Sequence, residues 1–200
     1  MQLTLIRHGQ STYNLENRFT GEIDVPLTQL GREEALIAGK KIADYHYDMA
    51  YTSLLIRAEE TLQIILKVIN QTQIPIIRNK ALNERNYGNL QGLNKTQTAI
   101  KFGDAQVLTW RRSFEVRPPG GESLEDTFNR TVPYYKSKIE PKLLTGKNIL
   151  VVAHGNSMRA LIMFLEHIGK VDISKLNIPT GLPRNYLINS SKEVLAVSYL

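Results

Sequence analysis

The sequence predicts an α/β domain with a largely parallel sheet, and two observations carry this prediction. Short apolar runs alternate along the chain with longer segments whose apolar residues recur at helical spacing, which is the order of a βαβ protein. Two of the apolar runs end in the same dipeptide, His8-Gly9 and His154-Gly155. Ligands bind at the carboxyl ends of strands in open α/β sheets, so two adjacent strands would bring these histidines into one pocket.

The strands are expected to be short, because each apolar run is soon interrupted by polar residues, glycine or proline. Pro75 suits the start of a strand or the edge of the sheet, since proline lacks the N–H that a central strand donates. The expected strands are residues 3–6, 50–52, 74–77, 149–153, 186–188 and 194–199.

Helices are expected between these strands. Thr28 and Ser123 are residue types that cap helix N-termini, and Pro133 should kink its helix, or end it and start another. The polar segments 10–27 and 81–92 should be irregular loops, and loops of such length are often functional. The expected helices are residues 28–44, 57–70, 94–102, 105–112, 122–144 and 157–167.

The composition suits one globular domain, residues 1–200, with a helical elaboration at about 94–146. Hydrophobic residues make up 42% of the chain and charged residues 22%, which is ordinary for a soluble protein. No stretch approaches the ~20 apolar residues of a membrane span, and the first residues resemble a strand rather than a secretory signal. The chain has no cysteine, which excludes disulfides and thiolate metal sites. A cytoplasmic protein without a membrane partner is therefore expected.

The net charge of +6 favours an acidic partner. Nucleic-acid-binding proteins tend to carry a basic run or stripe with stacking aromatic residues. Here the longest purely basic runs are the pairs Lys40-Lys41 and Arg111-Arg112. A small phosphorylated metabolite is therefore the favoured partner, and a non-catalytic nucleic-acid-binding protein is the alternative from another class.

The segment that follows the first strand has the residue types that bind and transfer an oxyanion. Arg7 offers a planar fork of donors, and His8 can act as a nucleophile, a base or a metal ligand. Gly9 would let the backbone approach a ligand closely. The nearby cations would repel a metal ion, so no metal is expected. The loop adds the polar groups Gln10, Ser11, Asn14, Thr20 and Gly21, for which ordinary loop and capping contacts are the alternative.

Glu84 is a candidate acid–base group. It stands among Arg85, Asn86 and Tyr87 in a predicted loop, and phosphoryl transfer needs one proton donor among many positive groups. The alternative is an exposed acid that pairs with Arg85.

Three further arginines are candidates for anion binding. Arg57 lies in the first turns of a predicted helix, where a cation opposes the helix dipole. Arg111 and Arg112 are adjacent on a helix, about 100° apart around its axis, so both can lean toward one ligand.

These motifs together resemble the histidine phosphatase superfamily, whose mark is Arg-His-Gly at the end of the first strand. Within that superfamily the chain is similar to the cofactor-dependent phosphoglycerate mutases over nearly its whole length. The most specific matches are Gln-Gly-Leu-Asn-Lys at 91–95, Trp-Arg-Arg at 110–112 and Leu-Asn-Ile-Pro-Thr-Gly at 176–181. The resemblance implies a three-layer fold, with a mostly parallel mixed sheet, one antiparallel strand, and helices on both faces.

The resemblance also implies a function and residue roles. His8 would be the phosphorylated nucleophile and Glu84 the proton donor and acceptor. Arg7, Arg57 and His154 would bind the transferring phosphoryl group. The implied reaction is the interconversion of 3-phosphoglycerate and 2-phosphoglycerate in glycolysis and gluconeogenesis, primed by 2,3-bisphosphoglycerate, without metal, in a homo-oligomer (a dimer or tetramer). The implied substrate-site residues are Arg7, Gln10, Ser11, Asn14, Thr20, Gly21, Arg57, Glu84, Arg85, Asn86, Tyr87, Lys95, Arg111, Arg112, Gly155 and Asn156.

Some positions depart from the mutase pattern. Gln10 stands where the mutases usually have Glu, and Asn86 where they usually have His. The stretch around 118–121 is shortened, and the chain ends at Leu200 without the long tail that covers the site in many mutases. A mutase must keep water from its phosphohistidine, so a phosphatase of the same fold, acting on small phosphate monoesters, is the alternative function.

Overall fold

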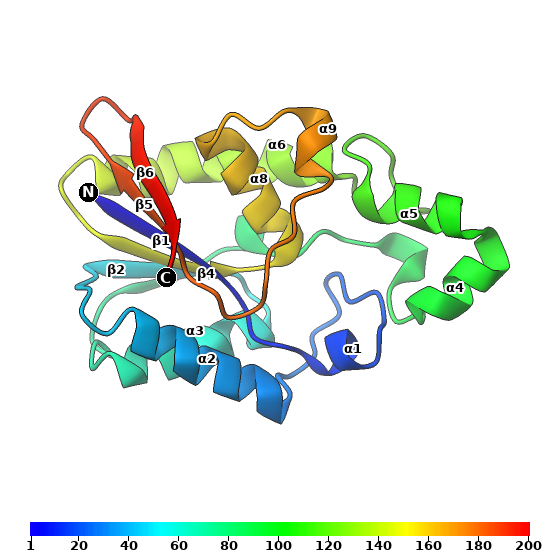
Figure 1. Ribbon diagram of the computed structural model, residues 1–200, viewed down its shortest axis with the longest axis horizontal. Coiled ribbons are helices and arrows are strands. Elements are labelled where there is room, and N and C mark those ends of the chain that lie inside the picture. The colour runs from blue at the N-terminus through cyan, green and yellow to red at the C-terminus, as the bar shows by residue number, and fades with distance from the viewer.

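The computed structural model describes all residues from 1 to 200. A six-stranded sheet with the strand order β3-β2-β4-β1-β5-β6 forms the middle layer, and helices lie on both sides of it (Figure 1). β3, β2, β4 and β1 are parallel, whereas β5 is antiparallel to both of its neighbours. The predicted mixed sheet with one reversed strand is confirmed. The strands are β1 (Gln2–Arg7), β2 (Met49–Thr52), β3 (Ile76–Arg78), β4 (Ile149–Ala153), β5 (Arg184–Ile188) and β6 (Val194–Tyr199).

Two groups of helices cover the two faces of the sheet (Figure 1). One face carries α2 (Gln29–Lys41) and α3 (Ile56–Val68), and the other carries α6 (Leu124–Tyr134) and α8 (Gly155–Leu165). A pair of helices, α4 (Lys95–Phe102) and α5 (Asp104–Arg112), extends to one end of the molecule. The short elements are α1 (Thr12–Leu15), η1 (Lys80–Leu82), η2 (Gly88–Leu90), η3 (Tyr135–Ile139), α7 (Glu140–Leu143) and α9 (Lys170–Ile173).

The two central strands are buried on both faces, which explains their nearly continuous apolar sequences. Side chains alternate between the faces along each strand. Leu3 and Leu5 of β1 join the core beneath η3 and α8, whereas Ile6 joins the core beneath α2 and α3. In β4, Val151 belongs to the first core and Val152 to the second.

The alignment of β1 with β4 determines where the functional site lies. The two strands are parallel neighbours in which Arg7 stands opposite Ala153. The backbone N–H of His8 donates to the carbonyl oxygen of Ala153 over 3.0 Å. The expectation that the two His-Gly strands are adjacent is therefore confirmed, and both histidines leave the sheet at its carboxyl edge.

Several local expectations need correction. The predicted loop 10–27 contains the one-turn helix α1, and α9 was not expected at all. Helix α8 begins at Gly155, two residues before its predicted start at 157, since the Ser157 hydroxyl accepts a hydrogen bond from the backbone N–H of His154. Pro133 was expected to kink its helix or to end it, and α6 does end one residue later, at Tyr134, where the chain passes directly into η3, a π-helix, and then into α7.

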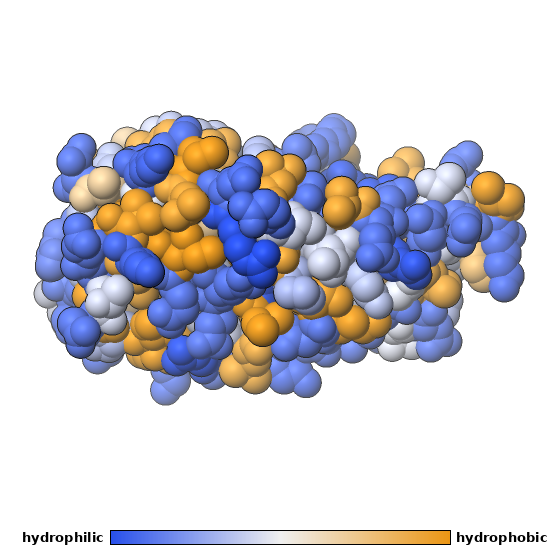
Figure 2. All heavy atoms as spheres, turned by 90° about the horizontal axis from the view of Figure 1, so that it is seen from below, coloured by the Kyte–Doolittle hydropathy of each residue, from blue (hydrophilic) through white to orange (hydrophobic).

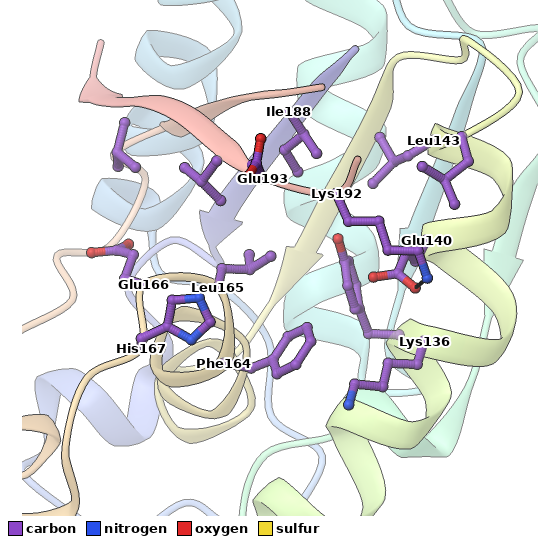
Figure 3. A pocket seen from close by; sticks show the side chains of 14 residues that line it. Lys136, Glu140, Leu143, Phe164, Leu165, Glu166, His167, Ile188, Lys192 and Glu193 are labelled. Carbon is purple, nitrogen blue, oxygen red and sulfur yellow. Dashed lines mark hydrogen bonds and ion pairs between the residues drawn. The ribbon is translucent and has the colours of Figure 1, made fainter. Parts of the chain in front are cut away.

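The surface has two features apart from the histidine-bearing edge. Apolar side chains gather on the broad end of the face shown in Figure 2, while the rest of that face is mainly hydrophilic. A hollow of 700 Å³ lies between η3, the end of α8 and the β5–β6 hairpin, with Phe164 and Ile188 on its apolar wall and Lys136 at its rim (Figure 3). It shares no residue with the cavity described below. None of the helices is long and apolar enough to cross a membrane.

Candidate active site

The rings of His8 and His154 lie side by side beyond the ends of β1 and β4. Their centroids are 4.9 Å apart and their planes are tilted by 58°, and both side chains are buried. The Nδ1 atom of His8 lies 2.7 Å from the carbonyl oxygen of Gly9. A carbonyl oxygen can only accept, so the geometry assigns the ring proton to Nδ1 and leaves a lone pair on Nε2.

Both imidazoles are held neutral. Burial, followed by the charges of Arg57 and Arg7, lowers the pKa of His8 well below its usual value. Burial and the charge of Arg57 act in the same direction on the pKa of His154, with smaller effects from His8, Arg7 and Arg130. A neutral His8 with a free Nε2 is the form of histidine that can attack an electrophile.

Three buried side-chain nitrogens around His8 have no hydrogen-bond partner in the protein. Arg57 is fully buried at the start of α3, and its two terminal nitrogens donate to carbonyl groups of the 21–23 loop. Its Nε has no partner, and neither do the Nε of Arg7 and the Nδ1 of His154. A buried donor without a partner costs about 1–3 kcal/mol. Donors arranged in advance in this way stabilise an anion that arrives later.

Glu84 is buried and is held by one of its two oxygens. Oε1 accepts hydrogen bonds from the backbone N–H of Arg85 over 2.9 Å, from that of Asn156 over 2.9 Å and from the Asn156 amide over 3.0 Å. Burial alone would raise the pKa of Glu84, but the two backbone donors and the charges of Arg7 and Arg57 outweigh it and lower the pKa. The resting Glu84 is therefore a carboxylate whose Oε2 has no hydrogen-bond partner.

A cavity of 210 Å³ opens beside these residues. Six cationic side chains and a single carboxylate, Glu84, line it. The cations crowd one another: burial, and then the charge of Arg111, lowers the pKa of both Lys95 and Arg112. An anionic ligand would relieve this repulsion. The lining residues are Arg7, Asn14, Arg18, Phe19, Thr20, Gly21, Glu84, Tyr87, Lys95, Arg111, Arg112, Gly155, Asn156, Arg159 and Asn177.

Most of the residues proposed from the sequence lie at this cavity or directly beneath it. His8, His154 and Arg57 form the buried base, where the three unpartnered nitrogens are found. No group of three or more His, Cys, Asp or Glu side chains lies close enough together to hold a metal ion. The predicted residues that line the cavity are Arg7, Asn14, Thr20, Gly21, Glu84, Tyr87, Lys95, Arg111, Arg112, Gly155 and Asn156.

Two predicted residues of the first loop do not line the cavity. The Oε1 of Gln10 accepts a hydrogen bond from the Thr28 hydroxyl, so this side chain joins the loop to the start of α2. Ser11 caps α1 and exchanges hydrogen bonds with Asn14. Both residues hold the shape of the loop that carries Asn14 into the cavity.

Two residues after Glu84 are also placed elsewhere. Arg85 is fully buried, and it donates to the Tyr87 hydroxyl and stacks over the Tyr87 ring. The Asn86 amide donates to Glu22 at a position where the mutases usually have His. Arg85 thus holds the cavity residue Tyr87 in place, and Asn86 joins its loop to the loop that contains Glu22.

Gly9 also has a packing role that the sequence did not reveal. A Cβ atom at this position would lie only 2.1 Å from the carbonyl oxygen of Gly31. The glycine is therefore needed for the close approach of α2. Its N–H donates to the Thr61 hydroxyl, which ties the loop to α3.

Four residues that line the cavity were not among the predicted site residues. Arg18 and Phe19 directly precede Thr20 in the sequence, and Asn177 lies in the matched motif at 176–181. Arg159 follows Asn156 by three positions on α8, a spacing that places both on one helix face. This spacing was the available signal for Arg159, whose terminal nitrogen donates to the Asn156 side-chain oxygen over 3.1 Å.

Comparison with known proteins decides the family. The model described as "Histidine phosphatase superfamily (branch 1)" matches residues 3–188. The chain belongs to the histidine phosphatase superfamily. Within this superfamily, a Cytophaga hutchinsonii relative is 54% identical over 198 residues, covering 99% of this chain and 92% of its own. A Rhizobium meliloti relative is 52% identical over 200 residues, covering 96% of this chain and 95% of its own. Both are named 2,3-bisphosphoglycerate-dependent phosphoglycerate mutase.

Solved structures of other histidine phosphatases share the fold. A phosphoglycerate mutase from Bacillus anthracis superposes with a TM-score of 0.78 at 25% identity, over 100% of this chain and 92% of that one. A mycobacterial glucosyl-3-phosphoglycerate phosphatase superposes with a TM-score of 0.85 at 24% identity, over 99% of this chain and 96% of that one. A mutase and a phosphatase therefore share this architecture, and the fold alone does not separate the two activities.

Proposed function

We propose that this protein is a 2,3-bisphosphoglycerate-dependent phosphoglycerate mutase that interconverts 3-phosphoglycerate and 2-phosphoglycerate through a phosphohistidine at His8. One observation carries the proposal: a neutral His8 with a free Nε2 lies among three unpartnered buried nitrogens, beside a cationic cavity with one carboxylate. The names of the two relatives at 54% and 52% identity support a mutase over a phosphatase.

The first step that the geometry supports is attack on His8-bound phosphorus by a substrate hydroxyl. Glu84 rests as a carboxylate because its pKa is lowered, so it can take the proton of the 2-hydroxyl of 3-phosphoglycerate. The new P–O bond forms as the P–N bond to His8 breaks in line. The Nε groups of Arg7 and Arg57 and the Nδ1–H of His154 donate to the phosphoryl oxygens, where charge must be stabilised.

The second step reverses these roles at the other phosphate. The Nε2 atom of His8 attacks the 3-phosphoryl group, and Glu84 returns its proton to the departing 3-oxygen. The product is 2-phosphoglycerate, and His8 is phosphorylated again. One proton and one phosphoryl group are conserved over the cycle, so the protein needs only a single acid–base residue.

The residues present fit 2,3-bisphosphoglycerate as the phosphoryl primer. Two phosphates and a carboxylate require many donors, and the cavity presents six cations, of which Arg112 has an unpartnered buried NH1. When bound, the bisphosphate supplies the phosphoryl group that His8 accepts. Arg7 and Arg57 would hold that group, whereas Arg111 and Arg112 would hold the more distant anionic groups.

A cytoplasmic location and a homo-oligomeric state belong to the same proposal. The glycolytic reaction that the relatives' name implies supports the first. The second rests on the family resemblance alone, and light scattering of the purified chain would measure it.

Product analysis tests the mutase against the phosphatase. The chain is incubated with 3-phosphoglycerate, with and without catalytic 2,3-bisphosphoglycerate, and 31P NMR follows 2-phosphoglycerate and inorganic phosphate separately. We expect isomerisation that depends on the bisphosphate and greatly exceeds phosphate release. Phosphate release that outpaces isomerisation at saturating bisphosphate would overturn the proposal in favour of the phosphatase.

A further inference from the structure

Ser53 makes an unusual pair of contacts directly beneath the site. The residue follows β2 and is fully buried. Its Oγ lies 2.7 Å from the Nε2 of His154, and it accepts a hydrogen bond from the backbone N–H of Leu55 over 3.1 Å. The hydroxyl has no other hydrogen bond, so its two neighbours determine how its single proton is used.

The proton of the hydroxyl has one available acceptor. Because the Leu55 N–H can only donate, it occupies a lone pair of Oγ and offers no place for the hydroxyl proton. In the opposite tautomer this hydroxyl proton would lack an acceptor whether or not a ligand is bound, whereas an unpartnered Nδ1–H gains an acceptor when a phosphoryl group arrives. The arrangement that satisfies both groups in the loaded site is donation from Ser53 to Nε2 of His154, which requires a lone pair on that nitrogen.

We propose that Ser53 is a positioning residue that fixes His154 as the Nδ1–H tautomer and so aims a hydrogen-bond donor, instead of a lone pair, at the transferring phosphoryl group. The inference rests on the proposed function for its consequence in catalysis, but the tautomer itself is a property of the free enzyme. It also accounts for the unpartnered Nδ1 of His154 in a fully buried side chain. That N–H is a donor kept ready for the phosphoryl oxygens.

The two adjacent imidazoles then have the same tautomer but present opposite atoms. His8 uses its Nδ1–H on the carbonyl of Gly9 and presents the Nε2 lone pair as a nucleophile. His154 gives up its Nε2 lone pair to Ser53 and presents Nδ1–H. With the other tautomer, a lone pair of His154 would face phosphoryl oxygens, and the two would repel each other.

A hydroxyl partner also limits what His154 can do with protons. A carboxylate or carbonyl beside a histidine accepts its N–H and stabilises the imidazolium, whereas Ser53 satisfies the neutral ring. The charged groups facing His154 are Arg7 from β1, Arg57 from α3 and Arg130 from α6, and all of them disfavour a further positive charge. His154 is therefore a neutral donor throughout, and Glu84 alone exchanges protons with the substrate.

Imidazole 15N NMR of the free, unphosphorylated enzyme tests the tautomer directly. We expect His154 to show a protonated, pyrrole-type Nδ1 and an unprotonated, pyridine-type Nε2. The Ser53→Ala variant should lose this preference and show a mixture of tautomers. Thr52→Val is the matched control, because it removes a buried hydroxyl that bonds to Val152 and does not touch His154. A protonated Nε2 in the wild-type enzyme would overturn the proposal.

Kinetics test the consequence for phosphoryl transfer. We expect Ser53→Ala to slow single-turnover phosphorylation of His8 by 2,3-bisphosphoglycerate about tenfold, less than the ~10²–10³ that removal of an oxyanion donor itself costs. The KM for 3-phosphoglycerate should change much less. In a His154→Ala background, Ser53→Ala should add no further loss, whereas an additional loss would overturn the proposal. An enzyme without mutase activity would refute the proposed function and leave the NMR result decisive for the tautomer.

Discussion

Asn156 donates twice to the same oxygen of Glu84, through its backbone N–H over 2.9 Å and through its side-chain amide over 3.0 Å. The amide orientation is not free, since the opposite atom of the group, Oδ1, accepts a hydrogen bond from Arg159. A cation on one side and a carboxylate on the other fix which end of the amide is oxygen. The result is a Glu84 with one committed oxygen and one available oxygen.

This arrangement predicts the effect of Asn156→Asp. The new carboxylate would face Glu84 Oε1 in place of a donor, so the pKa of Glu84 would rise from its lowered value. The loss of a hydrogen bond to a charged group, and the arrival of a second negative charge, both favour the protonated form of Glu84. The acid limb of the kcat–pH profile should therefore move to higher pH. Asn156→Ala should move it less, and an unmoved limb in both variants would contradict the assignment of Glu84.

The nucleophile assignment predicts the behaviour of His8→Ala. Turnover and acid-labile labelling of the protein by 32P-labelled 2,3-bisphosphoglycerate should both disappear, because no other neutral imidazole presents a free lone pair to the cavity. His46→Ala is the control, since His46 is exposed and lies beside Asn148, before the start of β4 and thus at the opposite edge of the sheet from His154. Acid-labile label retained in His8→Ala would show that another residue is phosphorylated.

The crowded cations of the cavity predict a binding defect for Arg112→Met. Arg112 lines the cavity with an unpartnered NH1. We expect KM for 3-phosphoglycerate to rise about tenfold, equivalent to about 1.4 kcal/mol, with a smaller change in kcat. Arg117→Met is the matched control, because Arg117 pairs with Asp126 outside the cavity. Equal KM values for the two variants would argue against a ligand at Arg112.

The buried neutral histidines predict a loss of stability in mild acid. Burial lowers the pKa of His8 and His154 in the folded chain, so the unfolded chain takes up protons that the folded chain refuses. Above pH ~6.5, the histidine pKa in the unfolded chain, neither histidine lowers the free energy of unfolding. Below that pH each one lowers it by up to about 1.4 kcal/mol per pH unit. Urea unfolding at about pH 7.5 and about pH 5.5 should show this loss.

The His154→Gln variant isolates one of these two contributions. Its unfolding free energy should depend on pH less steeply than that of the wild-type chain, because one buried titrating group is gone. His46→Gln is the control, because His46 is exposed and its replacement removes no buried imidazole. A His154→Gln slope equal to that of the wild type would show that the imidazole is not held neutral by the fold.

The proximity of His8 and His154 could be predicted from the sequence, because the ends of parallel strands follow a general rule. Two apolar runs that end in His-Gly become two parallel strands, and strand ends meet at one edge of a sheet. The short helices α1 and α9 escaped prediction for the opposite reason: one turn of helix has too few residues to show a period. Reciprocal hydrogen bonds between Ser11 and Asn14, which stabilise α1, involve residue types that are common in any loop.

Contacts between side chains that are distant in the sequence could not be predicted either. Ser53 was visible in the segment before Arg57, but its partner His154 lies 101 positions later. Gln10 and Asn86 carry polar groups of the right kind in the right loops, and only their orientation directs them to Thr28 and Glu22. A residue type and a loop position predict proximity to a site, whereas the direction of a side chain depends on packing that a single sequence does not reveal.

The backbone hydrogen bond from His8 to Ala153 joins the nucleophile to β4, the strand that His154 follows. Adjacent strands are about 4.8 Å apart in any sheet, which is close to the 4.9 Å between the two rings. The pairing of β1 with β4 therefore brings the two histidines together. Evolution or design could exchange the outer walls contributed by α4 and α5 to accept other phosphate esters, while the machinery at the strand ends stays intact.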